Sequence, residues 1–258
     1  MTGQKNRLDR ELVARGLTSS VELARAIIMA GEVLVDGQVE YRADRPVTTE
    51  NSLEIRIKHP FASRGALKIQ QAVQAFSLLV EGKTFLDIGI STGGFSDFLL
   101  KNGARSGLGV DVNPDQVDYR LRQDGRLRLL QANARDLKPA DIGFSPDIIV
   151  IDVSFISVIR ILPPLAAFPR ADILALIKPQ FEAERAEVGR GGVIRDTALC
   201  EEILMRLKGR VEALNFGLWG VCPAGVRGRR GNQEYFFLLK YGQKSIINDK
   251  MVHDGVNI

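Results

Sequence analysis

The feature that most constrains this fold is a glycine-rich turn between a strand-like and a helix-like segment, at residues 83–97, KTFLDIGISTGGFSD. Thr84–Ile88 is a short apolar run with β-branched and aromatic members, which suits a buried strand and is too short for a helix. A helical pattern, FSDFLLKNG, begins at Phe95 and stops at Gly103. Strand, glycine turn and helix form the geometry by which an α/β sheet receives a nucleotide at the carboxyl end of its first strand.

The turn also restricts the kind of ligand. Its glycines let the backbone approach a ligand, and the start of the following helix offers free N–H groups. Asp111 closes a second strand-like run, SGLGVD, at the place where an acid usually accepts hydrogen bonds from ribose hydroxyls. Ser91 stands where the G-x-G-x-x-G pattern has its second glycine, which counts against a dinucleotide such as NAD and favours a ligand without phosphates. An ordinary strand-to-helix turn with no ligand is the alternative.

Strand-like and helix-like segments alternate through residues 64–241, which we interpret as the larger of two domains. The expected strands are 84–88, 106–111, 127–131, 145–152, 172–177, 213–221 and 234–239. This alternation predicts an α/β fold with a Rossmann-like, doubly wound sheet of seven mostly parallel strands.

Four other segments of this region carry expectations of their own. A helix over 64–79 should bury one face, made by Leu67, Val73, Phe76 and Leu79. A polar helix is expected over 114–124, opened by an Asn-Pro step. The charged, glycine-rich segment 180–195 is expected to be a mobile flap beside the site, and the polar tail 242–258 is expected to fray.

Residues 1–58 predict a small α+β domain, followed by a linker at 59–63 in which Pro60 disfavours helix. Two short helices are expected within 7–25, then a strand that ends in a tight Asp36-Gly37 turn, and a return strand. Four arginines fall on the helices, where they could form one basic face or only a solvated helix surface: Arg7, Arg10, Arg15 and Arg25. The formal charge of +4 and the pI of about 9.1 lean toward an anionic partner.

Four ionisable residues are expected at the carboxyl edge of the sheet, outside which ligands bind in an open α/β fold: Lys68, Asp152, Lys178 and Glu234. Asp152 and Lys178 directly follow two strands that this topology usually makes neighbours. An acid and an amine beside a nucleotide pocket are a candidate functional site, although a single such residue is more often a helix cap or a surface ion pair.

Two resemblances sharpen this picture. RLDRELVARGLTSSVELARAIIMAGEVLVDGQV resembles the alpha-L RNA-binding motif first seen in small-subunit ribosomal protein four. After FASRGALKI, the chain resembles the TlyA (haemolysin A-like) family in DIGISTGGFSDFLL, IDVSFIS, LIKPQFEAER, GRGGVIRD and RGNQEYFF, over roughly residues 5–240. Members of that family are ribosomal RNA 2′-O-methyltransferases with an FtsJ-like catalytic domain, and they use S-adenosyl-L-methionine and release S-adenosyl-L-homocysteine.

The resemblance implies a role for each candidate residue. The family's catalytic Lys-Asp-Lys-Glu set falls on Lys68, Asp152, Lys178 and Glu234. The implied cofactor-binding residues are Asp87, Gly89, Ser91, Thr92, Gly93, Gly94, Phe95, Asp111, Asn133 and Asp152. The implied RNA-binding residues are Arg7, Arg10, Arg15, Ser19, Arg25, Arg64, Arg227, Arg229 and Arg230. Some relatives carry an Arg-x-Trp-Val linker where this chain has His59-Pro60-Phe61-Ala62, so cofactor-linked switching by the linker does not carry over.

The implied reaction is methylation of a cytidine 2′-oxygen in 16S rRNA, 23S rRNA or both. We expect Lys178, steered by Asp152, to ease removal of the hydroxyl proton, while Lys68 and Glu234 hold the ribose and hydrogen-bond the lysines. Either lysine could be the base.

The rest of the sequence limits other functions. No apolar run approaches the roughly 18–20 residues of a membrane span, and no secretion signal is evident, so a cytoplasmic protein without membrane contact is expected. Cys200 and Cys222 predict no disulfide framework, and the two histidines lack metal-ligand spacing. The alternatives are a catalytically idle RNA-binding factor in ribosome assembly, which has no need of all four ionisable residues, and a haemolysin, for which no amphipathic pore segment is found.

Overall fold

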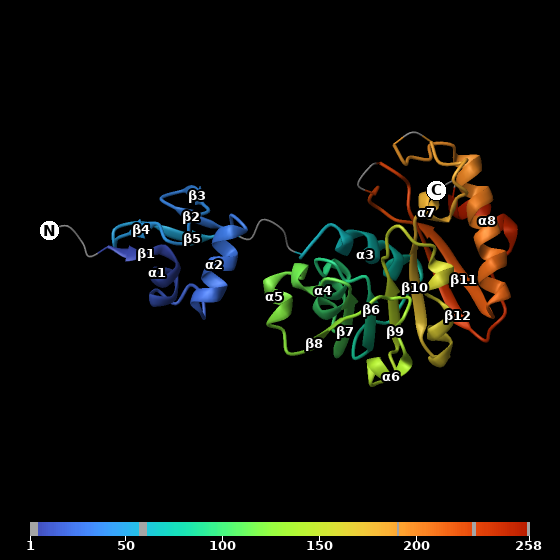
Figure 1. Ribbon diagram of the computed structural model, residues 1–258, viewed down its shortest axis with the longest axis horizontal. Helices are drawn as coiled ribbons and strands as arrows, with labels where there is room; N and C mark the ends of the chain where they lie inside the picture. The colour runs from blue at the N-terminus through green and yellow to red at the C-terminus, as the bar shows by residue number, and fades with distance from the viewer. Residues whose placement is uncertain (1–4, 57–60, 190, 229–230, 257–258) are drawn as a thin grey trace. The chain divides into compact units, whose positions relative to one another are not determined.

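The computed structural model describes residues 5–56, 61–189, 191–228 and 231–256 (Figure 1). The chain divides into two compact units, Met1–Pro60 and Phe61–Ile258. Of the predicted linker 59–63, residues 59 and 60 lie outside the described residues, whereas Phe61 and Ala62 pack on the second unit. The Phe61 ring lies 6.1 Å from that of Phe98, and the Ala62 amide donates to Asp97 Oδ2 at 2.7 Å.

The first unit combines two helices with short strands. Ser20 caps α2 by accepting a hydrogen bond from the Leu23 amide at 3.1 Å, and Asp36 and Gly37 both adopt positive φ in the predicted turn. The helices are α1 (Leu8–Ala14) and α2 (Val21–Met29), and the strands are β1 (Asn6–Arg7), β2 (Val33–Val35), β3 (Gln38–Glu40), β4 (Pro46–Val47) and β5 (Leu53–Ile55). The pairs β3-β2-β5 form one antiparallel sheet, and the two-residue pair β1–β4, which the sequence did not reveal, closes the unit.

The second unit is built on a seven-stranded sheet in the order β11-β12-β10-β9-β6-β7-β8. The strands are β6 (Thr84–Ile88), β7 (Ser106–Asp111), β8 (Leu127–Gln131), β9 (Ile148–Ile151), β10 (Asp172–Ile177), β11 (Phe216–Pro223) and β12 (Tyr235–Tyr241). β12 runs antiparallel to its neighbours β10 and β11, and the other neighbouring strands are parallel. The predicted doubly wound fold is confirmed. Its strand order reverses between β6 and β9, the position at which such sheets bind ligands.

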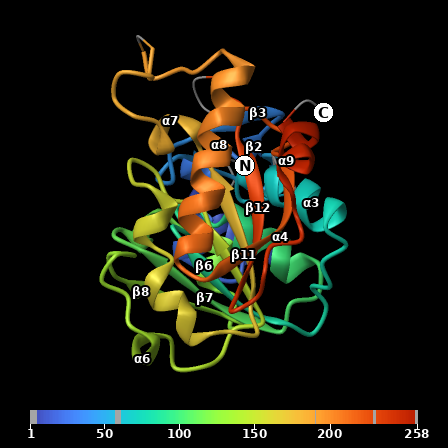
Figure 2. The same ribbon diagram turned by 90° about the vertical axis from the view of Figure 1, so that its right-hand side faces the viewer.

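Helices cover both faces of this sheet (Figure 2). On one face pack α3 (Gly65–Ala75), α4 (Gly94–Lys101) and α5 (Tyr119–Arg122). On the other face pack α6 (Pro139–Ile142), the 3-10 helices η2 (Val158–Arg160) and η3 (Pro163–Ala167), α8 (Thr197–Ala213) and α9 (Asp249–Val256). The remaining elements, η1 (Pro114–Gln116) and α7 (Pro179–Glu182), lie in the loops that follow β7 and β10. Apolar residues of central strands such as β9 are buried on both sides, as a parallel sheet requires.

The predicted inner face of the 64–79 helix is wrong at two of its four positions, whereas Val73 and Phe76 are partly buried and pack against the core. Leu67 and Leu79 are exposed, and the buried positions are Ala66, Ile69 and Ala72. The reason is the close approach of α4: a Cβ on its first residue, Gly94, would lie 3.1 Å from the Ala66 amide nitrogen. Small residues therefore face the contact, and α3 ends at Ala75, before Leu79.

Three polar segments differ from the expectation. The 114–124 helix is divided into η1 and α5, because Val117 is extended and Asp118 starts a new turn by accepting from the Arg120 amide. The tail 242–258 does not fray where it is described, since α9 forms and Val252 is fully buried. In the segment 180–195, Ile194 packs against Cys200 and Ile203, which anchors the predicted flap at its end.

Candidate functional site

The glycine turn after β6 is tightly packed against the loop that follows β9. Gly89 has a φ of +84°, and a Cβ there would lie 2.5 Å from the carbonyl oxygen of Asp152. Gly93, at +92°, is the N-cap residue directly before α4. Ser91 also adopts a positive φ, and its amide donates to Asp111 Oδ2 at 2.9 Å. The turn thus requires glycine at these points, and it brings Asp111 to the edge of the pocket.

A cavity of about 430 Å³ opens beside this turn. It is lined by Gly89, Ser91, Asp111, Asn133 and, from the loop after β9, residues 152–156. The Asp111 carboxylate accepts from the amides of Ser91 and Asn113, and its oxygens keep lone pairs for further donors. Its position fits a ligand hydroxyl, and the apolar residues opposite, such as Ile161, fit a flat ring.

A second cavity, of about 480 Å³, adjoins the first and shares Gly89, Ser91 and Asp152 with it. Its remaining lining residues are Ser63, Arg64, Gly65, Lys68, Asp87, Ile90, Thr92, Gly94, Phe95 and Arg227. Ten or more of the sequence-predicted site residues therefore meet around two connected spaces.

Asp87 lies under the second cavity with one oxygen satisfied and one not. Oδ2 accepts from the Ser96 amide at 3.1 Å and from the Ser96 hydroxyl at 2.7 Å. Oδ1 is buried and has no hydrogen-bond partner among the described residues. Burial raises the pKa of this carboxyl to about 7, against the Ser96 hydrogen bonds, and the negative charges of Asp152 and Asp111 add to the rise. A buried acceptor that faces a cavity suits a cationic ligand group.

The four ionisable residues form two lysine–carboxylate pairs. Lys68 Nζ lies 2.6 Å from Glu234 Oε2, and Lys178 Nζ lies 2.6 Å from Asp152 Oδ1. Lys178 and Glu234 are buried, and the side chain of Lys68 is 14% exposed. Both pairs reach the second cavity, the first through Lys68 and the second through Asp152.

The two lysines differ in their remaining contacts. Lys178 Nζ also donates to the Val153 carbonyl at 3.0 Å and to Ser154 Oγ at 2.9 Å, so all three of its N–H groups have acceptors. Lys68 Nζ has Glu234 as its acceptor, and its other N–H groups meet no acceptor among the described residues. The geometry holds Lys178 rigidly and leaves Lys68 donors for a ligand.

Two predicted cofactor-binding residues also make contacts that stabilise the fold. Phe95 is buried, and its ring lies 5.8 Å from that of Phe236 on β12. The Thr92 carbonyl accepts from the Asp118 amide, which fixes the turn to the loop after β7. Neither contact conflicts with a place in the cavity wall.

The predicted RNA-binding arginines of the first unit are engaged unequally. Arg7 and Arg25 share the buried carboxylate of Asp9, each at 2.8 Å, and together lower its pKa to about 2, with Arg7 as the larger cause. Arg15 bonds Glu11 and the carbonyls of Thr48 and Asn51, so it braces the fold. Arg10 and Ser19 are exposed.

In the second unit, Arg64 and Arg227 line the second cavity from its exposed side. Arg229 and Arg230 lie outside the described residues. Among those that are described, no group of three or more histidine, cysteine, aspartate or glutamate residues is arranged to hold a metal ion.

Sequence reasoning missed several residues of the site. Ser154 and Ser63 contribute hydroxyls, and Asn232 joins two loops by accepting from the Ile194 amide and donating to the Gly192 carbonyl. Phe155 is 90% exposed at a φ of +65°, with its ring 5.0 Å from that of Phe181. Ser154 and Phe155 directly follow Asp152–Val153, so their nearness to a predicted site residue was the available signal.

Comparison with known proteins places both units. Residues 61–241 match the model of the FtsJ-like methyltransferase family, and residues 6–51 match the S4 domain. The 16S/23S rRNA (cytidine-2′-O)-methyltransferase TlyA of Mycobacterium tuberculosis is 37% identical, over 98% of this chain and 97% of its own. Hemolysin A of Brachyspira hyodysenteriae is 39% identical, over 89% and 97%. A solved structure from Streptococcus thermophilus that is described as a hemolysin superposes with a TM-score of 0.74 at 34% identity, covering 98% of this chain and 94% of that one.

Proposed function

Because the chain belongs to the TlyA family of FtsJ-like methyltransferases, we propose that it methylates the 2′-oxygen of a cytidine in ribosomal RNA, using S-adenosyl-L-methionine. The name of the Mycobacterium tuberculosis relative supports ribosomal RNA of the small subunit, the large subunit or both as substrate. The S4 domain supports an RNA partner. We propose a cytoplasmic location, which a ribosomal substrate supports.

The two cavities fit this cofactor. Asp87 Oδ1, a buried acceptor without a partner among the described residues, fits the ammonium group at the methionine end. Asp111 fits the ribose hydroxyls, and Asn133 and Ile161 line the space for the adenine. When bound, S-adenosyl-L-methionine supplies a sulfonium methyl group that is already activated toward an oxygen nucleophile.

The remaining task of the site is to position the ribose hydroxyl and to help remove its proton. Positioning can contribute on the order of 7–11 kcal/mol, and acid–base assistance on the order of 10²–10⁴ in rate, so positioning is the larger effect. Lys68 would donate its remaining N–H groups to ribose oxygens while Glu234 orients it. Lys178, steered by Asp152, would exchange its contact with Ser154 Oγ for the 2′-oxygen and ease proton loss there.

The observation that carries the proposal is the placement of two buried lysine–carboxylate pairs against one glycine-lined cavity. An idle RNA-binding assembly factor would not need to retain these charges, because each buried ion costs several kcal/mol of desolvation. A relative carries the name Hemolysin A. In the described part of this chain, no helix combines the length and apolarity needed to cross a bilayer.

The test is transfer of tritium from labelled S-adenosyl-L-methionine to purified small and large ribosomal subunits that lack the modification, with identification of the product nucleoside. Lys178→Ala should lose transfer and keep cofactor binding. Lys83→Ala is the matched control, because Lys83 contacts Asp147 at the other end of β6, away from the cavities. Absence of transfer by the unaltered protein to either subunit, despite RNA binding, would contradict the enzyme and favour the assembly factor.

A further inference from the structure

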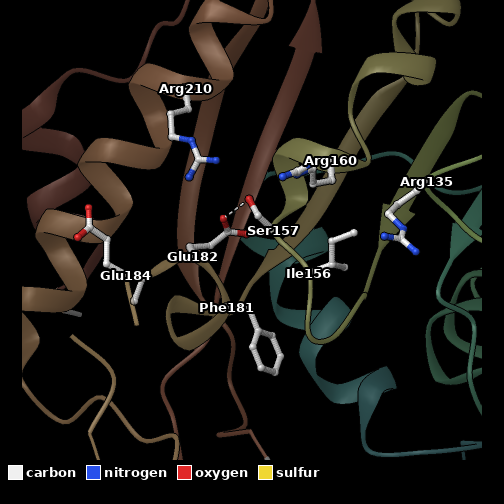
Figure 3. A pocket seen from close by; sticks show the side chains of 9 residues that line it. Arg135, Ile156, Ser157, Arg160, Phe181, Glu182, Glu184 and Arg210 are labelled. Atoms are coloured by element: carbon white, nitrogen blue, oxygen red, sulfur yellow. Dashed lines mark hydrogen bonds between the residues drawn. The ribbon is translucent and has the colours of Figure 1, made fainter. Parts of the chain in front are cut away.

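A third cavity, of about 540 Å³, lies beside the cofactor cavity and is rimmed by arginines (Figure 3). Arg160 belongs to η2, Arg210 to α8, and Arg135 to the loop after β8, so three separate elements supply the positive charges. Figure 3 shows Arg160 and Arg210 directed from two sides toward the hydrogen bond between Ser157 and Glu182 at the floor. Ile156 lines both this cavity and the cofactor cavity, so the two spaces are neighbours.

These arginines differ from others of the same unit because none of them forms a close ion pair with a described carboxylate, although Arg210 interacts electrostatically with Glu182 at longer range. Arg120, Arg126 and Arg206 each bind a carboxylate at 2.7–2.8 Å. Within the described ranges, no carboxylate lies in ion-pair distance of the guanidinium groups at the third cavity. Arg135 contacts its own turn through Asn133 Oδ1 at 3.4 Å. Guanidinium groups that surround a cavity without close ion pairs can bind an oxyanion, which two of them can contact together.

Two carboxylates, those of Glu182 and Glu184, also line the cavity, and hydrogen bonds hold Glu182 in place. Glu182 accepts from the Ser157 hydroxyl at 2.5 Å and from the Val158 amide at 2.8 Å, which turns its oxygens toward η2 and fixes the element that carries Arg160. Burial raises the pKa of Glu182, while its hydrogen bonds from Ser157 and Val158 and the charge of Arg210 oppose the rise. The carboxyl therefore has a structural role in the wall of the cavity, next to the arginines.

We propose that Arg160 and Arg210, with Arg135 at the rim, bind a phosphodiester group of the substrate RNA next to the nucleotide that is methylated. The cavity lies at the correct place for this, because the loop that supplies Asp152 continues through Ile156 and Ser157 into η2. Between the two spaces lie Phe155 on the cofactor side and Phe181 on the arginine side, with ring centroids 5.0 Å apart. The subsite rests on the proposed function, because it concerns where the RNA substrate of that reaction runs across the catalytic unit.

The test compares Arg160→Gln/Arg210→Gln with Arg126→Gln in the full chain. The substitution Arg126→Gln removes one charge of the same kind, but Arg126 is already bound by Asp124 and lies at the amino end of β8. Affinity for unmodified 16S and 23S rRNA is measured over a series of salt concentrations, with melting temperature and S-adenosyl-L-homocysteine affinity as controls of folding.

The double variant should bind RNA at least roughly tenfold more weakly, because each lost contact is a charge-assisted hydrogen bond. Its slope of log affinity against log salt should become shallower by about 0.7, the value for one phosphate contact to single-stranded RNA. In the methylation assay the KM for RNA should rise while kcat changes little, because the contacts are remote from the reacting oxygen. Arg126→Gln should match the unaltered protein in all three.

An unchanged salt slope and RNA affinity in the double variant would overturn the subsite. It would also be overturned if the double variant lost only the binding of inorganic phosphate, which would identify an adventitious ion site. If the unaltered protein transfers no methyl group but the double variant still loses salt-dependent RNA binding, the proposed reaction fails and the subsite stands. Arg160→Glu is a second variant, expected to weaken RNA binding further through repulsion at an unchanged melting temperature.

Discussion

Replacement of Asp87 by asparagine should stabilise the protein and weaken its cofactor binding at the same time. The carboxyl is 1% exposed, and its pKa is raised from 3.8 to about 7, with burial as the main cause. An acid whose pKa is higher in the folded state makes folding less favourable as pH rises. The unfolded chain ionises from about pH 4, whereas the folded chain holds its proton until about pH 7.

The size of this effect follows from the two pKa values. The interval from 3.8 to about 7 corresponds to roughly 4 kcal/mol of unfolding free energy lost by pH 8. Relaxation around a buried charge reduces such figures, so Asp87→Asn should gain about 1–3 kcal/mol at pH 8 and little at pH 4. Asparagine can keep both Ser96 hydrogen bonds through its carbonyl oxygen, which preserves the local structure.

The predicted effect of this substitution on cofactor binding is a loss of affinity, in contrast to the gain in stability. Asparagine cannot neutralise an ammonium group at the position of Oδ1, and hydrogen bonds to charged groups contribute about 1.5–3 kcal/mol. Affinity for S-adenosyl-L-homocysteine should therefore fall roughly 10- to 100-fold. In the unaltered protein, affinity should rise between pH 6 and pH 8 as Asp87 ionises. Burial is the main feature that sets this titration; the Ser96 hydrogen bonds oppose it, and the negative charges of Asp152 and Asp111 add to it.

The assay is chemical denaturation from pH 4 to pH 8.5 together with calorimetric titration of S-adenosyl-L-homocysteine. Asp147→Asn is the control, because the pKa of Asp147 is lowered, chiefly by the Thr84 amide hydrogen bond at the other end of β6. Its stabilising effect is present above about pH 4 and is lost below it, so this variant should lose stability at neutral pH and bind cofactor normally. The reasoning about Asp87 is refuted if its variant follows the pH profile of the unaltered protein, or binds the product as tightly.

Three further predictions concern the ion pairs and the packing. Lys68→Ala should lower methyl transfer at least about 10²-fold and also lower the melting temperature, because it leaves Glu234 buried without its partner; removing both side chains should restore the melting temperature and not the activity. Arg15→Ala should lower the melting temperature of the S4 domain, which Arg10→Ala should leave unchanged while it weakens RNA binding in a filter assay. Val252→Ala should cost roughly 2 kcal/mol in denaturation, and an unchanged stability would show that α9 does not pack as described.

The sequence predicted the elements whose signals are local. The apolar runs of β6, β7, β8 and β10 were located to the residue, since each is bounded by glycine or polar positions. The Asp36-Gly37 turn was predicted because its backbone conformation favours those two residues. The glycine turn after β6 was also predicted because its conformation favours particular residues: side chains in place of its glycines would collide with the neighbouring loop.

Features that depend on distant partners were missed. The inner face of α3 has the small residues Ala66 and Ala72 beside Ile69, because α4 approaches it closely, whereas hydrophobic periodicity alone favoured the larger leucines. Nothing local showed that α9 would bury Val252. The arginines of the third cavity are scattered over 135–210 in the sequence, and their convergence on one cavity is a property of the folded chain.

The pairing of the four ionisable residues shows why residue identities alone could not give the geometry. Asp152 and Lys178 come at the ends of β9 and β10, whereas Glu234 comes directly before β12. In a wholly parallel sheet, a residue before a strand and residues after strands lie at opposite edges. β12 is antiparallel to β10, and Ile177 pairs with Tyr235, so the next position along β10 brings Lys178 beside Glu234. The reversal of one strand thus moves Glu234 to the edge that carries Asp152 and Lys178, where Lys68, 166 residues away in sequence, meets it from α3.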